Sequence, residues 1–87
     1  MWNVTIKKKV RKDLDKLPVN VRGLFVQLIR NLSVDGPVQP SWPNYSKLGK
    51  QKYHCHLNYH YAVCWTAEEQ TITIEVYYAG SRENAPY

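Results

Sequence analysis

The chain has 87 residues, of which 44% are hydrophobic and 22% are charged, and this ordinary globular composition excludes a disordered chain. Twelve Lys and Arg against seven Asp and Glu give a net charge of +5, which favours an acidic partner, either a polyanion or a protein. The length predicts one small domain over residues 1–87.

No segment of the chain indicates export or membrane insertion. Residues Met1–Ile6 are followed directly by Lys7, Lys8 and Lys9, so the apolar region of a secretory signal is missing. The longest apolar run, Tyr61–Trp65, is far too short to span a bilayer. We therefore expect a cytoplasmic protein with reduced cysteines and no membrane partner.

The N-terminal part predicts a strand followed by a basic helix. Apolar residues occupy every second position of Trp2–Ile6, which is typical of a strand, and Lys7–Leu17 carries Val10, Leu14 and Leu17 on one narrow helical stripe. The five cations on the rest of this helix form either a solvated face with local ion pairs or a rim that binds phosphate, and we favour the rim. These cations are Lys8, Lys9, Arg11, Lys12 and Lys16.

The next segment predicts a second, strongly apolar helix from Pro18 to about Val34. Its apolar residues recur at helical spacing and are expected to form the core. They are Val21, Leu24, Phe25, Leu28, Ile29 and Leu32. Asp35-Gly36-Pro37 ends the helix, and the short link to the first helix predicts an antiparallel helical hairpin.

The C-terminal half predicts a loop and then an antiparallel meander of three strands. The prolines of Val38–Ser46 exclude regular structure there, and Trp42 in this loop is expected to pack over one end of the core. Tight polar turns join Tyr53–Leu57, Tyr61–Thr66 and Thr71–Tyr78. The predicted fold is α+β, in the order β-α-α-β-β-β, with the helical hairpin packed on one face of a mainly antiparallel four-stranded sheet.

The final strand predicts a rigid support for a functional residue. Ile72, Ile74, Val76 and Tyr78 alternate with more polar residues, so they are expected to share one face of the sheet. We expect Ala79-Gly80 to end the strand. Arg82 then follows just past a well-anchored element, where it is either part of a solvated tail or free to meet a ligand.

Taken together, these features resemble the RelE/ParE superfamily of toxins from bacterial toxin–antitoxin pairs, most closely its RelE-like members. The resemblance covers nearly the whole chain. It rests on the Lys-rich first helix, the apolar second helix, the segments Lys47-Leu48-Gly49 and Tyr53-His54-Cys55-His56-Leu57, and the ending Tyr78-Ala79-Gly80-Ser81-Arg82 with Tyr87. RelE-like members enter the ribosome and cut messenger RNA without a metal, by attack of a 2′-hydroxyl on the adjacent phosphate.

The resemblance also implies partners and an alternative. An antitoxin wraps and blocks the toxin, so we expect a small, acidic, partly disordered partner, a hetero-oligomeric complex, and the ribosome and mRNA as targets. The chain ends at Tyr87 without a closing helix, so the open face of the sheet is expected to need such a cover. ParE-like members share the fold but inhibit DNA gyrase without cutting RNA. A degenerate toxin that only binds its antitoxin is a third interpretation.

RNA transesterification needs a base, an acid and cations around the phosphate. Arg82 and Tyr87 match the arginine and tyrosine with which family members often end, which implies a phosphate clamp for Arg82 and base stacking or proton transfer for Tyr87. His54 and His56 lie two apart on a strand and so face one side, with His60 near the following turn. Imidazoles suit proton transfer near neutral pH, whereas partly buried structural histidines are the ordinary alternative.

Three lysines before the meander, Lys47, Lys50 and Lys52, lie where RelE-like members carry basic residues, although each is equally an ordinary exposed lysine. A zinc site is not expected, because Cys55 points away from its flanking histidines, and no cofactor is implied. The chain departs from the family in having no arginine between Arg30 and Arg82, which removes one expected phosphate ligand.

The two cysteines carry a geometric prediction. With Asn58–Tyr61 as a four-residue loop, Cys55 and Cys64 are expected to lie opposite each other across a hairpin. A disulfide is conceivable at such a position, but a reduced, buried pair is the preferred interpretation.

Overall fold

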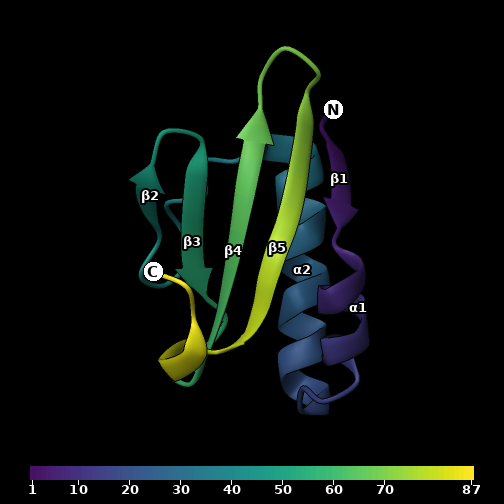
Figure 1. The fold of residues 1–87 in the computed structure, drawn as a ribbon, viewed down its shortest axis with the longest axis vertical. Helices are drawn as coiled ribbons and strands as arrows, with labels where there is room; N and C mark the ends of the chain where they lie inside the picture. Colours follow the sequence, from purple (N-terminus) through teal and green to yellow (C-terminus); the bar gives the residue numbers. More distant parts are fainter.

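The computed structural model describes residues 1–87, which form two α-helices and a five-stranded mixed sheet (Figure 1). The elements are β1 (Asn3–Ile6), α1 (Lys8–Leu14), α2 (Val19–Asp35), β2 (Ser46–Gly49), β3 (Lys52–His56), β4 (Tyr61–Glu68), β5 (Thr73–Ser81) and a 3-10 turn η1 (Arg82–Asn84). The strand order is β1-β5-β4-β3-β2, and only the β1–β5 pair is parallel. The α+β class and the mainly antiparallel sheet are confirmed.

The sheet has one strand more than predicted. The residues of β2 were expected to belong to a loop and to the segment that leads into the three-stranded meander. Residues Ser46–Gly49 read Ser-Lys-Leu-Gly, which lacks the β-branched and aromatic residues that favour a strand. The segment is extended because it pairs with β3 at the sheet edge, with Ser46 opposite His54 and Lys47 opposite Tyr53. Tertiary pairing overrides local preference here.

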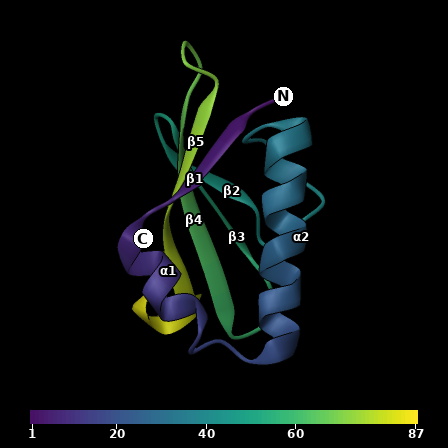
Figure 2. The same cartoon turned by 90° about the vertical axis from the view of Figure 1, so that its right-hand side faces the viewer.

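The two helices lie on different parts of the sheet. Helix α2 crosses one face, whereas α1 runs antiparallel to it beside β5 (Figures 1 and 2). Helix α1 ends at Leu14, earlier than predicted, because the chain tightens there: the Lys16 amide donates to the Asp13 carbonyl at 3.0 Å and the Leu17 amide to the Leu14 carbonyl at 3.1 Å. Neither helix combines the length and the apolar character that a membrane span needs.

The core fills the space between α2 and the sheet. Trp65 on β4 is fully buried at its centre, and its indole Nε1 donates a hydrogen bond to the Pro37 carbonyl at 3.1 Å. Trp42 packs on the edge of this core, as predicted, and donates to the side-chain oxygen of Asn31 at 3.0 Å. Helix α2 lies on one side of the sheet only (Figure 2). The other face, which we call the uncovered face, carries the C-terminal segment in its place, so side chains that point there are available for another purpose.

An irregularity in β5 changes which of its residues enter the core. Cys64 and Trp65 are neighbours on β4, but their partners on β5 are Tyr78 and Val76. Tyr77 is therefore an extra residue in β5. As a result Ala79 joins the core, and Tyr78 lies opposite Cys64 on the uncovered face, contrary to the predicted alternation. The strand also continues through Ala79-Gly80 to Ser81, so the predicted break there was wrong.

The predicted pairing of the two cysteines is also wrong. Cys55 lies opposite Val63, and Cys64 lies opposite His54, so the hairpin register differs by one residue from the prediction. Residues directly opposite each other share a face, so Cys55 points to the helix side and Cys64 to the other. Both are free and buried, and a bridge between them would have to pass through the sheet.

Candidate active site

The uncovered face of the sheet holds a buried pair of histidines from β3. His54 and His56 alternate with core residues and both point to this face, as predicted. Each is only 7% exposed, because neighbouring segments close over them from two sides. We use the name histidine cluster for His54, His56 and the three residues that contact their rings, Asn44, Ser46 and Tyr87.

Hydrogen bonds fix the orientation of both rings. Ser46 Oγ lies 3.0 Å from His54 Nδ1, and Asn44 Nδ2 lies 3.2 Å from His56 Nδ1. The Tyr87 hydroxyl lies 3.0 Å from His56 Nε2, and its ring centroid lies 4.3 Å from that of His54. Three of the four imidazole nitrogens therefore have a polar side-chain partner, and one aromatic ring covers the pair.

The C-terminal segment reaches the histidine cluster because the chain reverses after β5. The Arg82 amide donates to the His60 carbonyl at 2.8 Å, which ties the start of η1 to the β3–β4 turn. The Ser81 hydroxyl accepts a hydrogen bond from the Glu83 amide at 3.1 Å and caps this short turn. From there the last residues run back across β3 and place Tyr87 over the two imidazoles.

The environment of the cluster favours neutral imidazoles. Burial lowers the pKa of His54, and the charge of His56 lowers it further, while the Ser46 backbone opposes the shift. Burial also lowers the pKa of His56, and the positive charge of Arg82 adds to the effect. Two neutral imidazoles near pH 7 present both an N–H donor and a lone-pair acceptor, the two functions of an acid–base pair.

Arg82 lies at the edge of the cluster and is exposed. Its guanidinium donates to the Tyr59 carbonyl at 3.2 Å and lies 4.9 Å from the centroid of the Tyr59 ring. It lines a cavity of about 410 Å³ with residues of the β3–β4 turn and of η1. The lining residues are Tyr59, His60, Tyr61, Ser81, Arg82 and Glu83. Neither His54 nor His56 lines this cavity, but Arg82 is near enough to His56 for its charge to lower the pKa of that ring.

His60 lies apart from the other two histidines. Its ring meets the edge of Tyr59, with 5.1 Å between the centroids, and it lines the Arg82 cavity rather than the histidine cluster. The three histidines that the sequence singled out thus divide into a buried pair and one residue of the turn.

The three lysines before the meander separate in the same way. Lys52 shares the uncovered face with the histidine pair, because it lies two residues before His54 on β3. Lys47 faces the helix side, where its Nζ lies 5.5 Å from the centroid of the Tyr53 ring. Lys50 is in the β2–β3 turn. The three lysines therefore do not form one patch.

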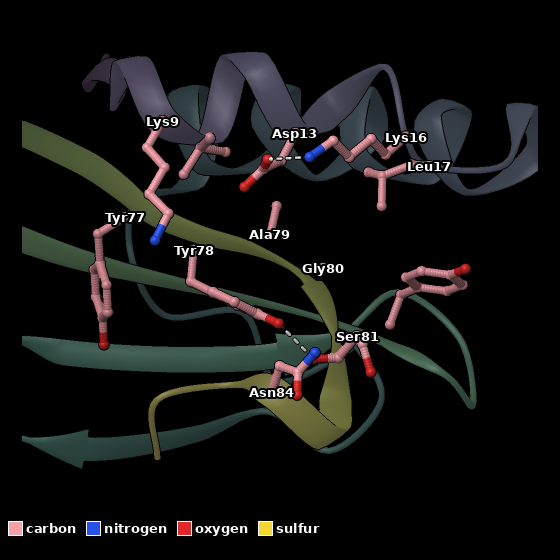
Figure 3. Close-up of a pocket in the computed structure, with 12 residues that line it drawn as sticks. Lys9, Asp13, Lys16, Leu17, Tyr77, Tyr78, Ala79, Gly80, Ser81 and Asn84 are labelled. Carbon is pink, nitrogen blue, oxygen red and sulfur yellow. Dashed lines mark hydrogen bonds and ion pairs between the residues drawn. The ribbon is translucent and has the colours of Figure 1, made fainter.

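The basic residues of α1 and of the turn after it border a second cavity, also of about 410 Å³, between this helix and β5 (Figure 3). Lys9 and Lys16 line it, whereas Lys8, Arg11 and Lys12 do not. Asp13 also lines it and forms an ion pair with Lys16 at 3.4 Å. Asn84 of η1 closes the other end, so the groove leads from α1 towards the C-terminal segment.

The sequence did not predict a role for two members of the histidine cluster, Asn44 and Ser46. They lie in a segment whose prolines indicated only an irregular loop, and their role depends on the pairing of β2 with β3. Nothing in the local sequence separates them from ordinary turn residues. No group of three or more His, Cys, Asp and Glu side chains converges as a set of metal ligands.

Comparison with known proteins gives matches in structure alone. No protein-family profile and no curated protein sequence matches the chain. The chain superposes on RelE in the RelE–RelB complex from the archaeon Pyrococcus horikoshii with a TM-score of 0.78 and 20% identity, covering 97% of this chain and 98% of that one. The isolated RelE toxin of E. coli gives 0.72 and 17%, covering 99% and 89%. A heterotetrameric YoeB–YefM toxin–antitoxin complex from Staphylococcus aureus gives 0.72 and 12%, covering 94% and 98%.

The class of fold is therefore a helical hairpin on a mainly antiparallel sheet, with the candidate site on the second face of the sheet. Within that class the chain has the fold of the RelE-type toxins over nearly its whole length. The predicted resemblance to the RelE/ParE superfamily, on its RelE-like side, is confirmed for the fold.

Proposed function

We propose that this protein is the toxin of a toxin–antitoxin pair and that it cuts messenger RNA on the ribosome without a metal. The observation that carries the proposal is the histidine pair on the uncovered face, with the Tyr87 ring over it and with the charge of Arg82 acting on His56. Two neutral imidazoles, a phenol and a guanidinium are the groups that 2′-hydroxyl transesterification needs. The RelE-type fold supports the same class of activity.

In the proposed mechanism Arg82 binds the scissile phosphate, because its planar fork matches two phosphate oxygens. One histidine of the pair takes the proton of the 2′-hydroxyl and the other gives a proton to the departing 5′-oxygen. Cleavage leaves a 2′,3′-cyclic phosphate and a free 5′-hydroxyl. In the free protein the Tyr87 hydroxyl is hydrogen-bonded to His56 Nε2, and a substrate oxygen replaces it there when RNA binds.

His60 and the lysines take supporting roles in this proposal. His60 shares the Arg82 cavity, where it contacts an adjoining part of the RNA chain. Lys52 extends the positive charge of the catalytic face, and the cations of α1 hold the flanking RNA and ribosome. Lys47 and Lys50 make their contacts outside the catalytic face.

The proposed partner is a small acidic antitoxin. The structural neighbour from S. aureus is a toxin–antitoxin complex, and the net charge of +5 of this chain suits an acidic partner. A partly disordered segment that folds on binding is the kind of chain that wraps a large exposed surface.

The proposal is tested by adding the purified protein to a cell-free translation reaction and mapping the message by primer extension. We expect translation to stop and discrete cuts to appear, and we expect the cuts to vanish when ribosomes are left out. Intact message with normal translation would overturn the proposal.

One observation favours a second candidate, a ParE-like inhibitor of DNA gyrase. No arginine lies between Arg30 and Arg82, so the catalytic face has one cation fewer than RelE-like nucleases carry there. A DNA supercoiling assay with purified gyrase separates the two candidates, because only the second predicts inhibition. A chain that binds an antitoxin and inhibits neither target would be a degenerate toxin.

A further inference from the structure

The loop before β2 is held against β3 at one residue, His56. The His56 amide donates to the Pro43 carbonyl at 2.8 Å, and the next residue, Asn44, places its side-chain nitrogen 3.2 Å from His56 Nδ1. Tyr45 then stacks near Tyr53, with ring centroids 6.4 Å apart, on the core side of the sheet. Anchors on both sides therefore hold the Asn44 side chain against the imidazole.

The atom that faces His56 decides where the imidazole carries its proton. An amide nitrogen donates hydrogen bonds and cannot accept them, so His56 Nδ1 must offer its lone pair to Asn44 Nδ2. A neutral imidazole has one N–H, which is then on Nε2. The Nε2–H points at the Tyr87 hydroxyl, 3.0 Å away, and this oxygen accepts from it.

We infer that Asn44 is a positioning residue that locks His56 in the tautomer protonated at Nε2 and so makes His56 the proton donor of the histidine pair. Which of the two histidines donates is a refinement of the proposed function, and the inference rests on that function only for its catalytic consequence. In the proposed reaction His54 takes the 2′-hydroxyl proton and becomes an imidazolium, while His56 gives its Nε2 proton to the departing 5′-oxygen. His56 is then one proton short, and it regains this proton from His54, whose ring centroid lies 5.5 Å away, so that both rings end neutral.

Residue type and backbone conformation at position 44 agree with this role. Asn44 has φ 53°, in the left-handed region that Gly, Asn and Asp adopt with least strain. Among these three residues only Asn can donate a hydrogen bond from its side chain at neutral pH. Asp would accept instead, and Gly would offer nothing. Both replacements are nevertheless compatible with the backbone, and Asn44 is exposed, so neither overpacks the site.

The surroundings of His56 keep it neutral and therefore make the tautomer observable. The titratable or charged groups that face it are His54 of β3, Arg82 of η1 and Tyr87 of the C-terminal segment. None of them is an anion near pH 7 that would favour the imidazolium, and burial lowers the pKa of His56 as well.

The test is long-range ¹H–¹⁵N NMR of the full chain labelled at histidine nitrogens, above the pH at which the rings are neutral. His56 signals are assigned with a His56→Gln variant. We expect the wild-type protein to show a proton on Nε2. Asn44→Asp is expected to move it to Nδ1, and Asn44→Gly to give a mixture of both tautomers. Asn20→Asp, which adds the same charge on the exposed start of α2, is expected to leave the spectrum unchanged.

A wild-type His56 protonated at Nδ1, or an Asn44→Asp spectrum like that of the wild type, would overturn the inference. In the cleavage assay Asn44→Asp is expected to lower the rate at least about tenfold, because the donor nitrogen has lost its proton. A changed tautomer with an unchanged rate would overturn the donor role of His56. A wild-type protein with the expected spectrum but no cleavage would overturn the proposed function and leave the tautomer lock supported.

Discussion

The Arg82 side chain is well placed to bind a ligand because so little of the fold depends on it. It is exposed, and its one side-chain hydrogen bond is to the Tyr59 carbonyl. We expect Arg82→Ala to abolish growth arrest and RNA cleavage while changing the free energy of unfolding by less than about 0.5 kcal/mol. Arg82→Lys should rescue little activity, because an ammonium lacks the planar fork. Growth on induction, primer extension and urea denaturation measure these effects.

The matched control for this prediction is Arg22→Ala on α2. Arg22 is also exposed, and its replacement removes the same charge, but it belongs to α2, which packs on the other face of the sheet from the histidine cluster. We expect this variant to remain fully toxic. A folded Arg82→Ala protein that arrests growth as the wild type does would refute the role of Arg82 as phosphate clamp.

The buried histidine pair predicts a loss of stability in mild acid. The folded state lowers the pKa values of His54 and His56, so the unfolded chain binds protons first as the pH falls. This stabilisation is complete above the unfolded value of about 6.5 and is lost as the pH falls through the folded values. We expect the urea midpoint of the wild type to decrease between about pH 7 and about pH 5 more than that of a His54→Gln/His56→Gln variant.

Residues outside the pair affect both proteins alike, so the difference between the two pH profiles isolates these two imidazoles. His60→Gln provides the control, because His60 lies in the turn and outside the cluster. It should keep the wild-type pH dependence. Parallel profiles for the wild type and the double variant would show that the pair does not resist protonation.

Among the elements, α2 offers a matched pair of valines for measuring what its buried face contributes. Val21 is 1% exposed and Val26 is 49% exposed, and both lie inside the same helix. Replacement by Ala changes the helix propensity equally at both positions, so the difference reports burial alone. We expect Val21→Ala to lower the free energy of unfolding by about 2 kcal/mol and Val26→Ala to change it little. Equal losses in urea denaturation would contradict this packing.

Strands β3 and β4 separate the two thiols by placing them on opposite faces of the sheet. Burial raises the pKa of Cys55 to about 12 and that of Cys64 to about 11, so both stay protonated and unreactive in the folded protein. We expect iodoacetamide to label neither thiol in the native state and both in urea, as read by mass spectrometry. Oxidation that links Cys55 to Cys64 within one folded chain would disprove the register.

The elements that the sequence predicted well are those whose pattern is long and local. The apolar repeat of α2 and the alternation in β3 led directly to the core and to the shared face of His54 and His56. Strand β2 and the extra residue Tyr77 could not be predicted, because each depends on a partner strand distant in sequence. Two of the five residues of the histidine cluster, His54 and His56, follow from β3 itself, whereas Asn44 and Ser46 reach the cluster through those non-local contacts.

At the scale of the whole molecule, the positive charge is mostly unpaired. Only two of the cations form ion pairs, Lys7 with Glu75 at 4.0 Å and Lys16 with Asp13 at 3.4 Å. Both pairs are solvent-exposed and contribute little stability. The remaining cations are free to attract an acidic partner. Lys9 of α1 and Lys16 of the following turn line the groove that leads towards η1 (Figure 3).

If that groove holds RNA, its lysines release counterions and the binding constant depends steeply on salt. We expect Lys9→Ala/Lys16→Ala to reduce the slope of log K against log[KCl] by about 1.4 for a labelled single-stranded RNA, at about 0.7 per lost phosphate contact. Fluorescence anisotropy measures this slope. The control, Arg22→Ala/Arg30→Ala, removes the same charge from exposed positions of α2 and should keep the wild-type slope, since net charge alone changes attraction but no contact. The same slope in both variants would mean that α1 acts through net charge and that the groove is not part of the RNA path.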